Sequence, residues 1–315
     1  MNKTSAPVVD DSVMIFGCGY VGTALARRLL ADGVRVGALT RNPEAAAHLR
    51  ALGVSEVIEA ELDDRAWHSR LAGSYAGVVN CVSSAGGGIE GYQKSYVEGQ
   101  RSVLEWARGR GVRRYLFTSS TSVYPQDDGG WVDETAETAG APETGRLLLE
   151  AEACVREAAA LFEQWYVFRL AGIYGPGRHY LLDQLREGAA VIPGRGDYAL
   201  NMIHLDDIVA AICAALLGEP PAPSGIYNLA DDAPATKENV LSWLAEAMGR
   251  PAPVFDPGQV SPRLQRRGGR MPDRKISNQK AKTTLGWQPR YPSFREGYFD
   301  QFSAHKNLLK IKSSN

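Results

Sequence analysis

The chain has 315 residues, of which 44% are hydrophobic and 23% charged, and its formal net charge is −1. This length suits one large α/β unit or two unequal lobes, and the balanced charge leaves no net field that would favour nucleic acid or an anionic membrane. No apolar run approaches the roughly 20 residues of a membrane helix, and the polar start lacks the apolar core of a signal peptide, so we expect a cytoplasmic protein.

The cysteines and histidines show neither a disulfide framework nor a metal site. The four cysteines are widely scattered, without a Cys-x-x-Cys pair, so we expect free buried thiols. The five histidines lack the spacing of metal ligands. The sequence therefore predicts no structural metal.

Predicted strands and helices alternate through the first half of the chain. The apolar run 13–16 predicts a buried strand, and apolar residues at helical spacing after it predict a helix that ends at Gly33. Further strands are predicted over 34–40, 54–60, 77–82, 114–119 and 165–170, and helices over 43–52, 65–71, 92–110 and 144–162. This alternation predicts an α/β fold, a Rossmann-type doubly wound parallel sheet with helices on both faces.

The pattern changes after Leu170. Residues 172–201 are predicted to be loop-rich, whereas 205–217 and 237–248 predict helices, the first of which returns to the first lobe. We therefore predict a larger domain over 12–170 plus about 201–218, and a smaller C-terminal lobe over about 171–200 plus 219–302. Residues 1–11 and 303–315 are expected to be flexible tails.

Gly17-Cys18-Gly19-Tyr20-Val21-Gly22 closes the first apolar run and opens the first predicted helix. In such a turn the first glycine allows a tight bend, the second lets the backbone approach a pyrophosphate, and the third lets helix and strand pack closely. The N–H groups at the start of the helix, near Tyr20 and Val21, would then face the phosphates. The alternative is a glycine turn without a ligand, but the strand–turn–helix–strand context favours a dinucleotide.

The second predicted strand ends in Thr40-Arg41-Asn42, and this end suggests which dinucleotide is bound. A carboxylate about 20 positions past the glycine motif would accept the ribose 2′-hydroxyl of NAD. None is present, and Arg41 can pair with the 2′-phosphate of NADP. We therefore favour NADP over NAD, the alternative being a solvent-facing Arg at a strand end.

Several later segments form an ordered series with the glycine turn: 61–64, 80–86, 97–99, 118–124, 169–178, 201–207 and 285–289. The series, from about Val13 to Phe302, resembles the extended short-chain dehydrogenase/reductase family, the group of nucleotide-sugar epimerases and dehydratases. The resemblance implies that Glu61 meets the adenine ring with the Leu62 backbone beside it. It also implies that the loop with Val82 and Ser83 passes along the cofactor. Ser120 takes the position of the catalytic Ser/Thr.

The chain departs from the family where the proton-transfer pair is expected. Counted from Ser120, the segment beginning Thr144-Gly145-Arg146 places Thr144 at the family's Tyr and Leu148 at its Lys. Tyr96 also replaces a usual Asn. A phenol has a pKa near 10, whereas an aliphatic hydroxyl is a far weaker acid and Leu148 supplies no cation. Thr144 is therefore a poor general acid or base.

Other residues could stand in for this pair. Tyr92, Tyr124 and Tyr174 are candidates to face the nicotinamide, although Tyr92 and Tyr124 are better explained as packing residues, and His204 as a helix cap or packing residue. Arginines in the second lobe could each grip an anion or be solvated surface charges: Arg178, Arg195 and Arg274.

The sequence thus predicts an NADP-binding relative of this family that oxidises, reduces or epimerises a small polar, sugar-like molecule by altered proton chemistry. The larger domain, 12–170 plus about 201–218, is then the NAD(P)-binding Rossmann domain, and the smaller lobe, about 171–200 plus 219–302, is the substrate lobe. The alternative is a non-catalytic NADP-binding protein that senses redox state or binds a partner. Fold resemblance alone does not choose between them. We expect a small-molecule ligand, with neither nucleic acid nor membrane as partner; the oligomeric state stays open, a homodimer included.

Overall fold

The computed structural model describes residues 12–84, 86–260, 271–299 and 302, so the predicted flexible tails lie outside the described residues. The chain divides into two compact units. The first comprises Met1–Ser120, Glu143–Phe168 and Val209–Ile226, and the second comprises Thr121–Pro142, Arg169–Ile208 and Tyr227–Asn315.

A seven-stranded sheet runs in the order β12-β7-β5-β4-β1-β2-β3. Its strands are β1 (Val13–Phe16), β2 (Val36–Thr40), β3 (Glu56–Glu59), β4 (Gly77–Asn80), β5 (Arg114–Ser120), β7 (Gln164–Leu170) and β12 (Gly225–Leu229). Strand β1 pairs in parallel with both β2 and β4. The chain order therefore reverses between β1 and β4, the point at which doubly wound sheets bind ligands at their carboxyl ends. The predicted parallel α/β sheet is confirmed.

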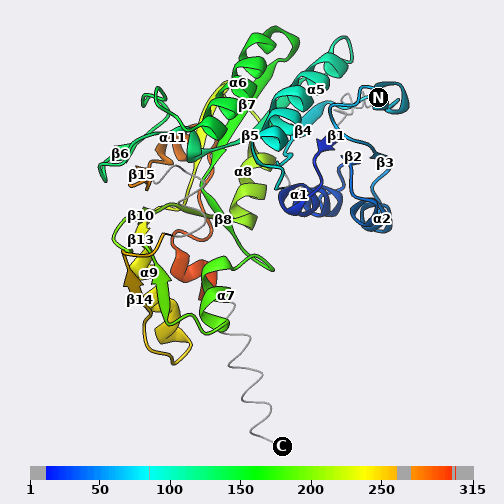
Figure 1. Ribbon diagram of the computed structural model, residues 1–315. Helices are drawn as coiled ribbons and strands as arrows, with labels where there is room; N and C mark the ends of the chain where they lie inside the picture. Colours follow the sequence, from blue (N-terminus) through cyan, green and yellow to red (C-terminus); the bar gives the residue numbers. More distant parts are fainter. Residues whose placement is uncertain (1–11, 85, 261–270, 300–301, 303–315) are drawn as a thin grey trace, which may run out of the picture. The chain divides into compact units, whose positions relative to one another are not determined.

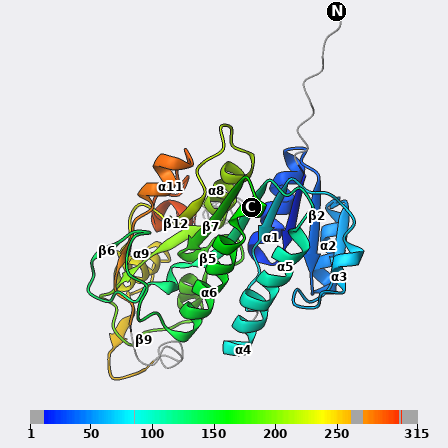
Figure 2. The same ribbon diagram turned by 90° about the horizontal axis from the view of Figure 1, so that it is seen from above.

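The helices of the first unit cover both faces of this sheet (Figure 1). Helices α1 and α2 lie on one face, and α5 and α6 run side by side on the other (Figures 1 and 2). The bounds of the helices in this unit are α1 (Tyr20–Ala31), α2 (Pro43–Ala51), α3 (Trp67–Arg70), α4 (Gly88–Tyr92), η1 (Gln93–Glu98), α5 (Gly99–Ala107), α6 (Glu143–Glu157) and η3 (Ala159–Leu161). Helix α8 (Leu205–Leu217) has residues in both units, and the short helix η2 (Thr121–Val123) belongs to the second.

The sequence explains the centre of this unit. All four residues of β1 are buried, because both faces of a central parallel strand are covered. The Phe16 ring lies 5.1 Å from the Trp67 ring and 5.4 Å from the Trp106 ring, so the three rings form an aromatic cluster. The helix predicted over 92–110 begins earlier, at Gly88, contains the π-helical segment η1 and ends at Ala107.

The second unit is built from short elements around its own core. Its core centres on α7, α9 and Tyr174. Residues 172–201 were predicted to be loop-rich, and α7 within them was missed because only Leu181, Leu182 and Leu185 mark its buried face. The elements are β6 (Trp131–Val132), β8 (Gly172–Tyr174), α7 (Tyr180–Arg186), β9 (Val191–Pro193), β10 (Ala199–Leu200), β11 (Met202–His204), β13 (Ala235–Thr236), α9 (Lys237–Ala247), β14 (Val254–Asp256), β15 (Lys275–Ile276) and α11 (Gln279–Thr284).

Across the described ranges, no helix combines the length and the apolar character that a membrane span requires.

Candidate cofactor site

In the turn between β1 and α1, close backbone contacts require glycine at positions 17 and 22. Gly17 has a φ of +90°, and a Cβ there would lie 2.6 Å from the Cα and N atoms of Val82. A Cβ on Gly22 would lie 2.5 Å from the Gly17 carbonyl oxygen. Both positions exclude larger residues, because neighbouring backbone cannot move aside as a flexible side chain can.

Gly19 differs from these two glycines. Its φ of −86° lies outside the left-handed region, and a Cβ there would meet no atom within 4 Å. No neighbouring atom therefore excludes a side chain at this position. Gly19 is the N-cap of α1 and offers no side-chain cap to that helix. An exposed, open helix start without a capping side chain is the geometry that lets an anionic group approach the backbone closely.

The loop after β4 is fixed beside the glycine turn. Asn80 is fully buried, and its side-chain amide donates to Oε1 of Gln100 at 2.6 Å. The Cys81 thiol donates to the Gly17 carbonyl at 3.3 Å. Burial raises the pKa of Cys81 to about 12, so the thiol keeps the proton that it donates. Val82 and Ser83, which follow, are thereby held next to the turn, and Ser83 is exposed.

The residues expected at the adenosine end come together at the ends of β2 and β3. One guanidinium nitrogen of Arg41 lies 3.6 Å from Oε2 of Glu61, and both side chains are half-exposed. Leu62 is buried, and its carbonyl accepts a hydrogen bond from the Trp67 indole at 3.0 Å. This pairing of Arg41 with Glu61 was not foreseen, because sequence patterns do not show which residues meet at the ends of neighbouring strands.

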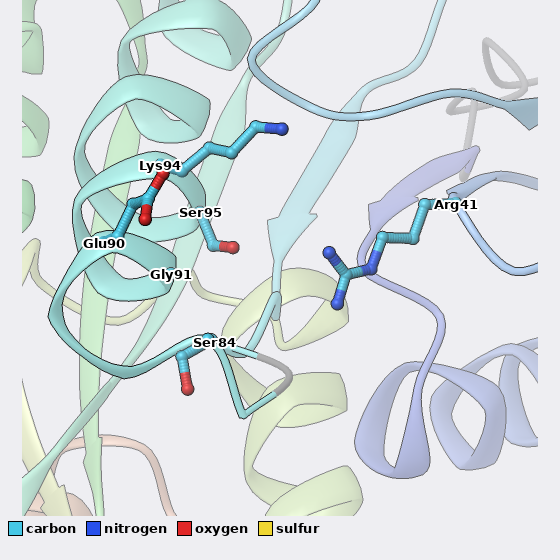
Figure 3. A pocket seen from close by; sticks show the side chains of 7 residues that line it. Arg41, Ser84, Glu90, Gly91, Lys94 and Ser95 are labelled. Carbon is cyan, nitrogen blue, oxygen red and sulfur yellow. The ribbon is translucent and has the colours of Figure 1, made fainter.

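Arg41 lines a recess of about 230 Å³ within the first unit. In Figure 3 the Arg41 side chain extends from the end of β2, and Lys94 and Ser95 extend from η1 towards the same space. Sequence reasoning missed Lys94 and Ser95, since polar residues on a predicted helix resemble a solvated face. The lining residues are Arg41, Ser84, Gly87, Glu90, Gly91, Lys94 and Ser95.

The predicted catalytic positions lie on β5 and α6, which pack against each other. Ser120 is the last residue of β5 and is partly buried. Thr144 is partly buried in the first turn of α6, and Leu148, one turn later, is only 1% exposed. Beside Ser120, the Ser119 hydroxyl donates at 2.6 Å to a buried carboxylate of Glu152. Position 148 is thus part of the hydrophobic core.

Two tyrosines considered as replacements are packing residues. The Tyr124 hydroxyl, in a side chain only 1% exposed, donates to Oδ1 of Asn228 at 2.8 Å and accepts from Arg169 at 2.9 Å. Tyr174 is 2% exposed, and a Cβ on Gly297 would collide with its ring.

The other second-unit candidates also have structural partners, and Tyr92 packs within the first unit. Nδ1 of His204 accepts from the Asp206 N–H at 3.2 Å, at the start of α8, so its interpretation as a cap is confirmed. Arg274 donates to the backbone carbonyls of Thr121 and Gln126. Arg195 forms an exposed ion pair with Asp197. In the first unit, the Tyr92 ring packs 5.0 Å from the Tyr96 ring.

Comparison with known proteins identifies the family. The chain matches the NAD dependent epimerase/dehydratase family over residues 13–230. It belongs to this family. The chain is 27% identical to the 3-diazoavenalumate denitrifying reductase of a Streptomyces species, covering 90% of this chain and 98% of that protein. It is 29% identical to Protein YeeZ of Escherichia coli (strain K12), covering 77% and 86%. The solved structure of MoeE5 with UDP-glucose and NAD shares the fold, with a TM-score of 0.76, 22% identity, and 95% and 99% coverage.

The residues present fit the cofactor that this NAD-dependent epimerase/dehydratase family uses. Gly19 leaves room for close approach at the start of α1, while Gly17 and Gly22 hold the turn against the β4 loop. Arg41 stands at the end of β2, where the adenosine ribose of a dinucleotide is selected. These features lie at the carboxyl edge of neighbouring parallel strands, so they can act on one extended ligand.

Proposed function

We propose that the protein is an NADP-dependent oxidoreductase or epimerase/dehydratase for a small polar, sugar-like substrate, and that its second unit recognises that substrate. The observation that carries the cofactor choice is Arg41. It projects into the recess from the end of β2, where an NAD-binding relative would present a carboxylate. Relatives named as reductases, such as the Streptomyces protein, support redox chemistry on a small molecule.

Different groups of the chain bind the cofactor and the substrate. The backbone of the 17–22 turn binds the pyrophosphate, and Arg41 binds the adenosine 2′-phosphate. Bound NADP or NADPH supplies the hydride acceptor or donor. Ser120 donates a hydrogen bond to a substrate oxygen and stabilises charge that develops there. Thr144 and Leu148 offer neither a phenol nor a cation, so proton transfer uses a group other than the pair that the family resemblance implies.

A second candidate is a protein that binds NADP without turnover. The observation that favours it is Leu148, because a leucine 1% exposed cannot lower the pKa of a neighbouring proton donor. This candidate predicts no turnover, together with protease sensitivity or partner binding that differs between NADP and NADPH. Turnover of any substrate, or equal behaviour with both cofactor forms, would contradict it.

Calorimetry with NADPH and NADH tests the cofactor assignment. A charge-assisted hydrogen bond is worth about 1.5–3 kcal/mol, so the wild type should bind NADPH on the order of tenfold to a hundredfold more tightly than NADH. The Arg41→Ala variant should lose most of this preference and keep its NADH affinity.

Arg50→Ala is the matched control for this experiment. Arg50 also pairs with a glutamate of the β3 region, Glu59 at 2.6 Å, and is also half-exposed, but it does not line the recess. Its substitution should leave both affinities unchanged. Equal wild-type affinities for NADH and NADPH would end the NADP assignment, and binding of neither would end the cofactor assignment.

A further inference from the structure

We propose that Lys94, in the π-helical segment η1, is a second ligand of the adenosine 2′-phosphate and selects the cofactor together with Arg41. The inference rests on the proposed use of NADP and adds a residue from a different element of the fold. Arg41 and Lys94 line the same recess of about 230 Å³. They approach it from different sides, Arg41 from the end of β2 and Lys94 from η1 (Figure 3).

Both cations have loosely held counterions. Nζ of Lys94 lies 3.7 Å from Oδ2 of Asp63, and Arg41 lies 3.6 Å from Glu61. By contrast, other exposed ion pairs of the first unit are shorter: Arg50–Glu59 at 2.6 Å, Arg65–Glu105 at 2.6 Å and Arg101–Glu150 at 2.8 Å. Exposed pairs of such length contribute little. A phosphate, with nearly two negative charges and three acceptor oxygens, can therefore displace both carboxylates at small cost.

The local backbone explains why Lys94 is held in this place. The N–H of Gly99 donates to the Lys94 carbonyl, which is the i→i+5 bond that defines a π-helical turn. A Cβ on Gly99 would lie 3.0 Å from the Leu62 side chain, so Gly99 packs directly on Leu62. Leu62 is flanked in sequence by Glu61 and Asp63, the two counterions. The π turn and the segment after β3 are thus packed together, which holds Lys94 close to the segment that carries both counterions.

The remaining lining residues suit a phosphate as well. Ser84 and Ser95 bring hydroxyl groups, and Gly87 and Gly91 bring backbone without side chains. Glu90 is the one carboxylate of the lining. The recess therefore combines two cations with hydroxyl donors, which matches a phosphomonoester rather than an unsubstituted ribose.

The test measures NADPH and NADH affinities by calorimetry for the wild type and for Lys94→Ala, Arg41→Ala and the double variant. Lys94→Ala should weaken NADPH binding about fivefold to tenfold, less than Arg41→Ala, because an ammonium makes a point contact and Arg a bidentate one. NADH affinity should stay within about twofold of the wild type, and the double variant should bind both cofactors equally.

Arg101→Ala is the control, since Arg101 is an exposed cation of the adjoining helix α5 that pairs with Glu150 and does not line the recess. A second arm uses 2′,5′-ADP and 5′-AMP as probes, which carry the adenosine end with and without the 2′-phosphate. Only 2′,5′-ADP should weaken with Lys94→Ala, and its affinity should fall more steeply with salt in the wild type than in that variant.

The outcomes separate this inference from the proposed function. If the wild type and Arg41→Ala behave as proposed but Lys94→Ala keeps the full preference for NADPH, Lys94 has no role and this inference alone is overturned. If Lys94→Ala weakens NADH and NADPH equally, Lys94 contacts a shared part of the cofactor, and the 2′-phosphate assignment is wrong. If the wild type shows no preference, the NADP assignment and this inference both fail.

Discussion

The glycine turn after β1 and the first turns of α6 belong to the same unit but differ in how they match the family pattern: the turn keeps the expected residues, and α6 does not. In the turn, Gly17 and Gly22 are demanded by backbone contacts and Gly19 leaves an open approach. On α6, the resemblance to the extended family places the proton-transfer pair at Thr144 and Leu148, and Leu148 is a core residue. The proposed cofactor-binding turn and the position that the resemblance gives to the proton-transfer pair therefore lie in separate segments of the chain.

The physical reason for this separation is the range of each interaction. The turn acts through backbone N–H groups and the shape of the strand–helix junction, which the fold itself requires. A catalytic tyrosine and lysine would act through two side chains, and α6 forms its amphipathic pattern with Thr and Leu at the positions that the resemblance gives to this pair. Backbone contacts of the fold therefore require Gly17 and Gly22, whereas α6 forms with Thr144 and Leu148 in place.

The largest effect is expected for Leu148→Lys, which restores the family's cation. A charge placed without a partner at a site 1% exposed should cost about 3–5 kcal/mol of unfolding free energy. Leu148→Met, which conserves volume, should cost less than ~1.5 kcal/mol. Urea denaturation followed by circular dichroism measures both. If Leu148→Lys lowers the free energy of unfolding by less than ~1 kcal/mol and NADP stabilises the variant further, position 148 faces the cofactor. That result would contradict the contrast drawn between the glycine turn and α6.

The next effect concerns Ser120, which the resemblance places at the family's catalytic Ser/Thr position. If the protein turns over a substrate, Ser120→Ala should lower kcat by about 10²–10³, the usual result of removing one donor to developing charge. Steady-state kinetics on the identified substrate measure it, with Ser122→Ala as the neighbouring control. An unchanged kcat for Ser120→Ala would remove Ser120 from the mechanism.

A smaller effect sharpens the description of the turn. Gly19→Val should weaken NADH and NADPH alike, on the order of tenfold to a hundredfold, because the side chain stands where the pyrophosphate approaches and costs a charge-assisted hydrogen bond. Valine is a poorer helix N-cap than glycine, but a Cβ at this position meets no atom within 4 Å, so the apo protein should lose only a few degrees of its thermal midpoint. Thermal unfolding and calorimetry separate the two effects. A much lower midpoint with unchanged affinity would mean that Gly19 serves the fold and not a ligand.

The smallest effect is expected for Thr144→Ala. An aliphatic hydroxyl without a nearby cation is a poor acid or base, so turnover and NADPH affinity should both stay within about twofold of the wild type, since the hydroxyl is given no role in either. The informative comparison is the pH profile of kcat/KM, which should not change either. Abolished turnover in this variant would show that the hydroxyl carries the proton after all.

The sequence predicted the sheet well, because buried parallel strands are short apolar runs and the turn glycines interrupt them. Strand 13–16 coincides with β1, and the predicted helix 205–217 coincides with α8. The short strands of the second unit were not predicted, since two or three residues carry too little periodicity. Helix α7 was missed for the same reason: a single turn and a half of leucines does not stand out among glycines and prolines.

The candidate site was predicted only where one segment carries the information. The glycine motif and Arg41 are local signals, so they could be found. The approach of Lys94 to the recess could not be predicted, because it depends on a π-helical turn, on Gly99 packing against Leu62, and on the pairing of β2 with β3. These are long-range consequences of the fold. The substrate has no such local signature in the sequence.

The most direct test of the central claim is a crystal structure of the NADP complex. The account predicts the pyrophosphate at the start of α1 against Gly19, the 2′-phosphate beside Arg41, and no tyrosine–lysine pair beside the nicotinamide C4. A pyrophosphate bound away from the 17–22 turn, or a tyrosine and a lysine together at C4, would contradict it.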